Sequence, residues 1–215
     1  MTVTEDRPSY KWVGTRPIRP DGYDKVVGKA RFAADLNLPG QLHAAILRSP
    51  HGHARVLSID TTAAEAMPGV KAVVTCADFP ELDASNPERD VAENLMARGV
   101  VLYVGHALAA VAASTRTEAA AAVAAIEVEY ELLPVVLSLD ESMAEGAPLV
   151  NEHNVTMFVE SDGPSNLATV NALERGDVDA AFEAADLVVE REFETAWVHQ
   201  GYIEPHACVV DVGMD

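Results

Sequence analysis

Short runs that are apolar, or that alternate between apolar and polar residues, predict the β-strands of this chain. Alternation with a period of two is typical of a strand with one buried face, whereas a fully apolar run fits a strand covered on both faces. The run 107–113 (ALAAVAA) is of the second kind, and 187–197 (LVVEREFETAW) alternates large apolar residues with glutamates. We expect strands over 41–47, 55–59, 70–76, 100–103, 107–113, 126–131, 168–174, 187–197 and 207–212.

Capping residues and turn formers predict the helices between these strands. Ser114 or Thr115 precedes the alanine-rich run 117–125, which has high helix propensity and side chains small enough to let a helix lie close to a sheet. The Pro-Gly pair at 68–69 ends a short helix that begins after residue 60. We also expect helices over 139–144 and 178–185, and a helical turn over 91–97.

Two strand–helix–strand units lie within residues 55–131. They indicate an α+β or α/β domain, with antiparallel pairing where connections are short. We expect a first domain over 25–145 and a second that opens at 146. The region from 166 to 215 has too few residues to bury a good core alone. We therefore expect it to be the first part of a larger domain that is completed elsewhere.

Two other segments lack a regular pattern. Residues 1–24 form an expected extended arm, which Tyr10, Trp12 and Val13 would anchor to the body of the protein or to a partner. The excursion 78–99 is long for a compact domain, and such loops often carry function or form interfaces.

Charge and composition remove several classes of function. The chain has 215 residues, with 15 basic against 34 acidic, and no basic footprint for nucleic acid or an anionic membrane surface. It shows no secretory signal and no apolar run long enough to span a bilayer, so we expect a cytoplasmic protein. Cys76 and Cys208 lie far apart, which argues against a disulfide framework or a cysteine-rich metal site and favours buried free thiols.

Polar residues near strand ends are the candidates for chemistry. His51 and His53 form an H-x-H pair, but the sequence offers no third metal ligand nearby. For His106, we favour a turn histidine bonded to the backbone over a proton relay. Glu204 and His206 flank a proline, and we favour a role in fixing a loop or a domain contact over general acid–base catalysis. Dinucleotide, Walker and nucleophile-elbow motifs are absent from the sequence.

Three blocks of sequence follow one another along residues 25–212. They read GKARFAADLNLPGQLHAAILRSPHGHARVLSID with TTAAEAMPGVKAVVT directly after it, LYVGHALAAVAASTRTEAAAAVAAIEVEYELLPVVLSLDESM, and ERGDVDAAFEAADLVVEREFETAWVHQGYIEPHACVV. Together they resemble, in the family's order, the large molybdopterin-binding subunit of the xanthine dehydrogenase/aldehyde oxidase family of molybdenum hydroxylases. The variants YVGHALAAVAA and VHQGYIEPHA are similar to bacterial members.

The resemblance implies an α+β fold, with an α/β hammerhead domain over 25–145 and the opening portion of a molybdopterin-binding domain over 146–215. The family's cofactor loops and catalytic glutamate fall beyond this sequence, so no catalytic, cofactor-binding or metal residue is carried onto it. Gln200, Glu204 and His206 are expected to support the pocket.

The resemblance also implies a function for the complete assembly. A molybdenum–molybdopterin centre would act on an aromatic, heterocyclic, aldehyde, CoA-thioester or CO substrate, and electrons would leave through iron–sulfur and FAD subunits. We expect a hetero-oligomer in which a remaining molybdopterin-binding chain completes the site, and an isolated chain that is inactive. The alternative is a truncated, non-catalytic structural or interaction module.

Overall fold

A computed structural model describes residues 10–83, 88–154, 156–157, 163–173 and 175–213 of the chain. The chain divides into two compact units, one formed by Gly40–Arg191 and the other by Met1–Pro39 together with Glu192–Asp215. The first unit contains both sheets and most of the buried residues, so it holds the core of the protein.

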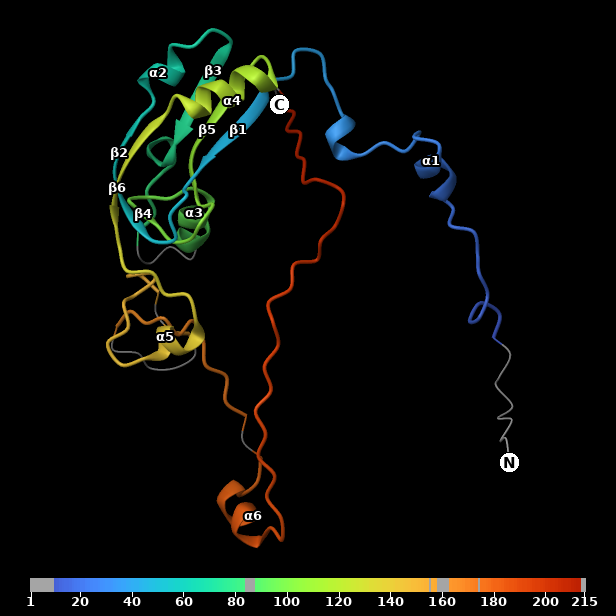
Figure 1. Cartoon of the computed structure of the whole chain (residues 1–215), viewed down its shortest axis with the longest axis vertical. Coiled ribbons are helices and arrows are strands. Elements are labelled where there is room, and N and C mark those ends of the chain that lie inside the picture. The colour runs from blue at the N-terminus through green and yellow to red at the C-terminus, as the bar shows by residue number, and fades with distance from the viewer. Residues whose placement is uncertain (1–9, 84–87, 155, 158–162, 174, 214–215) are drawn as a thin grey trace. The chain divides into compact units, whose positions relative to one another are not determined.

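Six strands in the described part of the first unit form two antiparallel, three-stranded sheets (Figure 1). The first sheet has the order β1–β5–β3, with β5 in the centre. The second has the order β4–β2–β6, with β2 in the centre. The strands are β1 (His43–Arg48), β2 (Ala54–Asp60), β3 (Val70–Thr75), β4 (Val100–Val101), β5 (Ala107–Ala113) and β6 (Glu127–Leu132).

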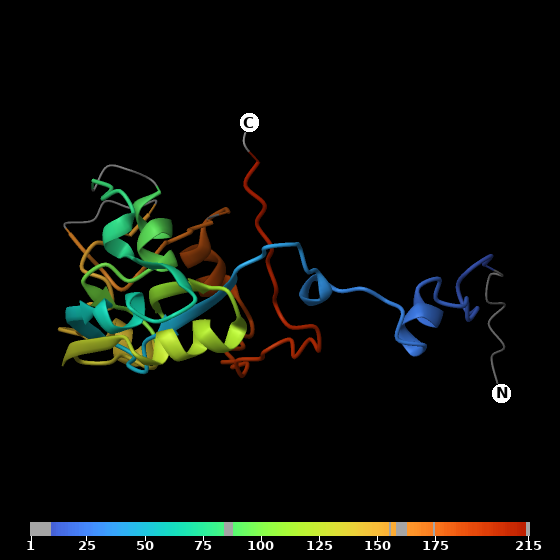
Figure 2. The same ribbon diagram turned by 90° about the horizontal axis from the view of Figure 1, so that it is seen from above.

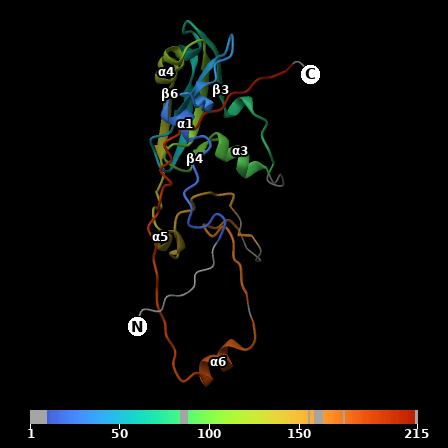
Figure 3. The ribbon, with the colours of Figure 1, turned by 90° about the vertical axis from the view of Figure 1, so that its right-hand side faces the viewer.

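The two strand–helix–strand units each connect one sheet to the other. The chain passes from β2 through the short helix α2 (Thr62–Glu65) to β3, and from β5 through α4 (Arg116–Ala124) to β6. Figure 2 shows α4 running beside β1, while α3 (Arg89–Leu95) lies near β4 in Figures 1 and 3. The expected α+β class and antiparallel pairing are confirmed.

Two apolar clusters form the core and meet at β5. One joins Ala109 and Val111 of β5 to Ala122 of α4, and the other joins Leu108 to Ala54 and Val101 of the second sheet. Leu108 and Ala109 are both fully buried, although they point to opposite faces of β5. Burial on both faces is therefore confirmed for the start of this strand, whereas Ala110 and Ala112 are only half-buried.

The N-terminus of α4 depends on Thr115. Its hydroxyl accepts a hydrogen bond from the Glu118 amide at 3.2 Å and donates one to the Glu118 carboxylate at 2.9 Å. Replacing Thr115 with alanine should lower the free energy of unfolding by about 1 kcal/mol, because an N-terminal amide loses its acceptor. Thr117→Ala, at an exposed position inside the same helix, should be neutral or slightly stabilising, and equal losses in chemical denaturation would contradict the capping role.

Three of the expected strands do not form in the described residues. Residues 168–173 contribute only an isolated bridge between Thr169 and Met157, and 187–197 and 207–212 are extended without a paired neighbour. A strand needs another strand for its backbone hydrogen bonds, and the described part of the chain provides none there. The expected helices are present as α5 (Leu139–Met143) and α6 (Val178–Ala184).

The second unit contains two short elements that the sequence pattern did not predict, α1 (Gly22–Val26) and a 3-10 turn, Ala33–Asp35. Asp21, just before α1, pairs with Arg19 at 2.6 Å and with Lys25 at 2.8 Å. The hydrogen bonds from Arg19 and Lys25 hold the pKa of the Asp21 carboxyl well below its usual range. This local pairing accompanies a helix that buries no residue.

Other expectations about exposure turn out differently. Tyr10, Trp12 and Val13 are more than half exposed within their own unit, and their anchoring to the body of the protein or to a partner stays a prediction. Cys208 is exposed and Cys76 is half-buried, so the expectation of two buried thiols was wrong; the apolar neighbours of Cys208 are themselves mostly exposed. Both cysteines are free. No helix in the described ranges is long and apolar enough to cross a membrane.

Candidate functional site

The polar turn 199–206 brings two of the three predicted support residues together. Glu204 and His206 line one shallow hollow with Tyr202, whereas Gln200 lies outside its lining. The Tyr202 hydroxyl is hydrogen-bonded to the His206 ring, and the two rings meet edge to face at 4.9 Å. Every residue of this turn is exposed, so the arrangement is a surface feature of the second unit.

Tyr202 organises this turn, and the sequence reasoning did not single it out. Its ring also lies 5.7 Å from that of His199, whose Nδ1 accepts a hydrogen bond from the Gly201 amide at 3.0 Å. Gly201 has a φ of 63°, a left-handed conformation that glycine adopts without strain. One feature of the sequence could have identified Tyr202: it lies three positions after one histidine and four before another.

His106 is buried and bonded to the backbone, as the sequence analysis favoured. Its Nε2 lies 2.8 Å from the carbonyl oxygen of Glu93, and its Nδ1 lies 3.2 Å from the amide nitrogen of Leu102. A carbonyl can only accept and an amide can only donate, so the ring is neutral with its proton on Nε2. Burial lowers the pKa of His106, and the hydrogen bond to Glu93 opposes this only in part.

The H-x-H pair has a structural role in the corner between β1 and β2. His53 donates from Nδ1 to the carbonyl oxygen of Pro134 at 2.7 Å, and His51 meets the ring of Tyr130 edge to face at 4.7 Å. The Ser49 hydroxyl accepts the amide of His51 at 3.0 Å and is itself buried. The two histidines therefore use their rings to fix this corner against the end of β6.

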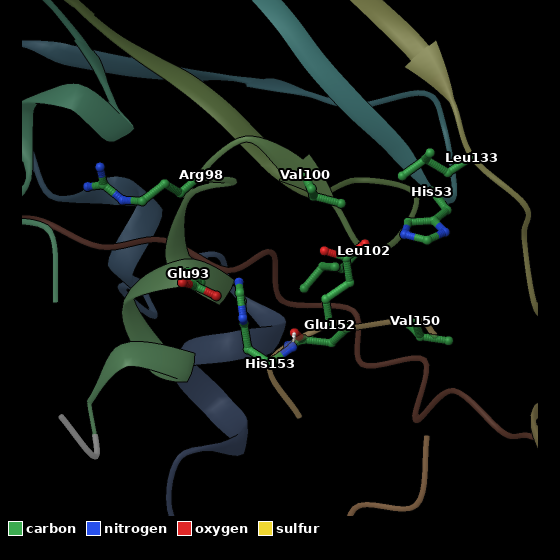
Figure 4. Close-up of a pocket in the computed structure, with 10 residues that line it drawn as sticks. His53, Glu93, Arg98, Val100, Leu102, Leu133, Val150, Glu152 and His153 are labelled. Carbon is green, nitrogen blue, oxygen red and sulfur yellow. Dashed lines mark hydrogen bonds between the residues drawn. The ribbon is translucent and has the colours of Figure 1, made fainter. Parts of the chain in front are cut away.

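A pocket lies where the segment 150–153 passes over the α3–β4 region (Figure 4). Its lining combines apolar side chains with charged and imidazole groups. The lining residues are His53, Glu93, Arg98, Val100, Leu102, Leu133, Val150, Asn151, Glu152 and His153. Asn166 holds one wall, because its side-chain oxygen accepts the Val150 amide at 2.9 Å and its amide group donates to the Pro148 carbonyl at 2.9 Å.

Two arginines with defined partners lie near this pocket. Arg98 donates to the carbonyl oxygens of Cys76 at 2.6 Å and Phe79 at 2.9 Å, and so ties the chain after β3 to the chain before β4. Arg89 pairs with Glu93 at 2.8 Å, with both side chains about four-fifths buried. In the portions of the chain that the structure describes, no three His, Cys, Asp or Glu side chains are arranged to hold a metal ion.

Comparison with known proteins relates this geometry to a family. The profile of the aldehyde oxidase and xanthine dehydrogenase a/b hammerhead domain matches residues 27–134, which is half of the chain. The chain belongs to the aldehyde oxidase and xanthine dehydrogenase family. A second profile, that of the molybdopterin cofactor-binding domain, matches residues 159–215 of this molybdenum hydroxylase family member. The two sheets and their crossing helices are thus the hammerhead.

Relatives of this family member come from several bacteria. The nicotinate dehydrogenase large molybdopterin subunit of Eubacterium barkeri is 34% identical over 93% of this chain and 44% of that one. A probable xanthine dehydrogenase subunit of Bacillus subtilis is 37% identical over 87% of this chain and 24% of that one. The chain spans less than half the length of these curated relatives.

A solved structure shares the fold. The quinoline 2-oxidoreductase of Pseudomonas putida 86 superposes with a TM-score of 0.57 and 37% identity, over 66% of this chain and 19% of that one. The structural similarity therefore covers about two thirds of the chain. Its sequence identity of 37% is well above the range in which two proteins share only a fold.

The described residues within 159–215 do not by themselves fit a molybdopterin. This range has thirteen acidic and two basic residues, a poor environment for the phosphate of the cofactor. Its polar turn is exposed and its hollow is shallow, and the described residues leave no buried side-chain polar atom without a hydrogen-bond partner. The enclosing donors that such a cofactor needs are not assembled by this part of the chain.

Proposed function

We propose that this chain supplies the hammerhead scaffold and the opening part of the cofactor-binding domain of a molybdenum hydroxylase. The scaffold comprises residues 25–145, preceded by the arm 1–24, and the cofactor-binding part begins at 146. The complete enzyme would act on an aromatic, heterocyclic, aldehyde, CoA-thioester or CO substrate. Bound molybdenum–molybdopterin would supply the redox chemistry, and this chain's residues would position its surroundings.

One observation carries the proposal that further protein completes the site. The segment 187–197 alternates apolar and acidic residues like a strand, yet Leu187, Phe193 and Trp197 are 79%, 89% and 98% exposed. An extended backbone with one apolar face is stable only when strands pair with it and a core covers that face. Residues beyond these 215, in the same polypeptide or a separate one, would provide both, and the cofactor site would form with them.

The partner subunits follow from the same proposal. The two bacterial relatives are each named as a subunit, one of a nicotinate dehydrogenase and one of a probable xanthine dehydrogenase, and such names denote parts of assemblies. We infer a hetero-oligomer in which electrons leave the molybdenum centre through iron–sulfur and FAD subunits. In it, Gln200, Glu204 and His206 would stabilise the loop beside the cofactor rather than attack the substrate, since Tyr202 already engages His206.

Co-expression with the product of the sequence immediately downstream tests the proposal. We expect a co-purifying complex with about one molybdenum per chain and hydroxylase activity, and neither in the isolated chain. Phe193→Ser should reduce recovery of the complex several-fold because it removes an apolar contact, whereas Glu192→Ser on the opposite face should not. If no combination of neighbouring products brings metal or activity, the chain is a non-catalytic module and the proposal is wrong.

A further inference from the structure

His106 joins two parts of the hammerhead that share no strand pairing. One hydrogen bond goes to Glu93 in α3, and the other comes from Leu102 in the turn between β4 and β5. Both Glu93 and Leu102 also line the pocket of Figure 4. The ring is 1% exposed and stacks on Tyr103 at 4.5 Å. The buried imidazole thus connects two walls of the pocket. Two further hydrogen bonds link the same parts of the chain, from the Tyr103 hydroxyl to the Asn94 carbonyl at 3.1 Å and from the Ala97 amide to the Ala107 carbonyl at 2.8 Å.

Main-chain hydrogen bonds fix the turn from which the His106 side chain projects. The Ser49 amide donates to the His106 carbonyl at 2.9 Å, the Gly105 amide donates to the Ser49 carbonyl at 2.8 Å, and the His106 amide donates to the Tyr103 carbonyl at 3.1 Å. The ring therefore projects from a turn whose main chain is already fixed. The two hydrogen bonds to Glu93 and Leu102 then fix the orientation of the ring.

The charged side chains around this turn are engaged with partners other than the His106 ring. Arg48 donates to the Gly105 carbonyl at 2.8 Å, next to His106 in the chain, and Arg98 is held by the Cys76 and Phe79 carbonyls. The carboxylate of Glu93 is paired with Arg89, and Tyr103 presents its ring face. Across the pocket, His53 is bonded to Pro134, and Glu152 and His153 are exposed. Among the described contacts of the ring, none is with a carboxylate.

We propose that His106 is an acid-sensitive latch that holds α3 and the β4–β5 turn together and releases the pocket wall when it takes up a proton. The proton enters at Nδ1, which then becomes a donor and faces the donor amide of Leu102. That amide loses its acceptor, and a positive charge appears on a buried ring. The bond from Nε2 to Glu93 persists but cannot compensate for both losses.

The direction of the pH dependence follows from the lowered pKa of His106. Above the ordinary histidine pKa of about 6.5, the ring is neutral in both open and closed states and the latch is at full strength. Below that value the open state binds the proton first, so opening becomes more frequent as the pH falls, until the lower pKa of the closed state is reached. A one-proton latch gives at most about a tenfold rise in opening per pH unit.

Hydrogen exchange on the full 215-residue chain at pH 7.5 and 5.5, corrected for intrinsic exchange chemistry, tests the latch. We expect opening of residues 93–106 to rise by up to tenfold at pH 5.5, while amides of β5 such as that of Val111 change less. His106→Gln keeps one acceptor and one donor but cannot titrate, so its opening should not depend on pH. His153→Gln, on the exposed side of the pocket, is the matched control and should behave like the unmodified protein.

The latch is overturned if opening of residues 93–106 is equal at both pH values, or if His106→Gln retains the full pH dependence. Should His106→Gln fail to fold, the nitrogen chemical shifts of the His106 ring in the unmodified chain decide instead. They must show the neutral Nε2–H form at pH 7.5 and a titration that coincides with the exchange profile of the Leu102 amide. A ring already charged at pH 7.5 would refute the latch.

Discussion

Leu108→Ala is expected to lower the free energy of unfolding by about 2–5 kcal/mol. Leu108 is fully buried and packs with Ala54, Ala97 and Val101 where the two sheets of the hammerhead meet. Truncation leaves a cavity in a cluster whose other buried members are small, so the surroundings have little side chain with which to fill it. Urea denaturation followed by circular dichroism measures the change.

Leu137→Ala is the matched control for this prediction, because the same atoms are removed from a side chain that is 86% exposed. Its effect should lie within about 0.5 kcal/mol of zero. If the two variants lose similar stability, the cluster around Leu108 is not the core that joins the sheets.

The second large effect is expected from overpacking α4. Ala119 and Ala122 are the buried residues of this helix, and Ala122 packs in one cluster with Ala109 and Val111 of β5, which leaves no room there for a larger side chain. Ala122→Leu should lower the free energy of unfolding by about 1–3 kcal/mol, because the helix must move away from the sheet or the side chain must adopt a strained rotamer.

Ala121→Leu adds the same atoms to the exposed neighbour of Ala122 and should have little effect in the same denaturation experiment. An unchanged stability for Ala122→Leu would mean that α4 does not rely on small side chains for its close approach. A loss in both variants would indicate a general intolerance of the helix to leucine.

The sequence was sufficient to locate the elements of the hammerhead. The apolar run of β5 and the Thr115 cap of α4 are where pattern and propensity placed them, because both signals are local. The division into two sheets was not predicted. Periodicity shows which residues of a strand share a face, but it does not name the neighbouring strand, and here each helix leads from one sheet to the other.

The sequence predictions failed in two situations. In one, a strand needs a partner strand, and in the other, exposed ion pairs between nearby residues accompany a helix. The alternation of 187–197 is a genuine strand pattern, but in the described chain it has no partner, so the backbone remains extended and exposed. In contrast, α1 has no apolar stripe to detect, and pairs with Asp21 accompany it.

At the candidate sites, the hydrogen bonding of a histidine could be predicted from the sequence, whereas its position in the folded chain could not. The expectation that His106 bonds to the backbone is confirmed, since a histidine beside a turn glycine has few other partners. Its position between two walls of a pocket requires α3 to place Glu93 beside the turn, which no local pattern encodes. Similarly, Glu204 and His206 could be named from their spacing around a proline, but the ring of Tyr202 between His199 and His206 depends on the geometry of the turn.

The crossing of the chain between sheets has a consequence for synthesis on the ribosome. β1 pairs with β5, which is synthesised some sixty residues later, and β2 pairs with β6. Neither sheet can therefore complete its strand pairing while the first strands are emerging from the ribosome. Pairings of such sequence separation make folding slow and leave apolar strands uncovered in the nascent chain. The hammerhead therefore completes its sheets only after residue 132 has left the exit tunnel, and until then its early strands are exposed to aggregation.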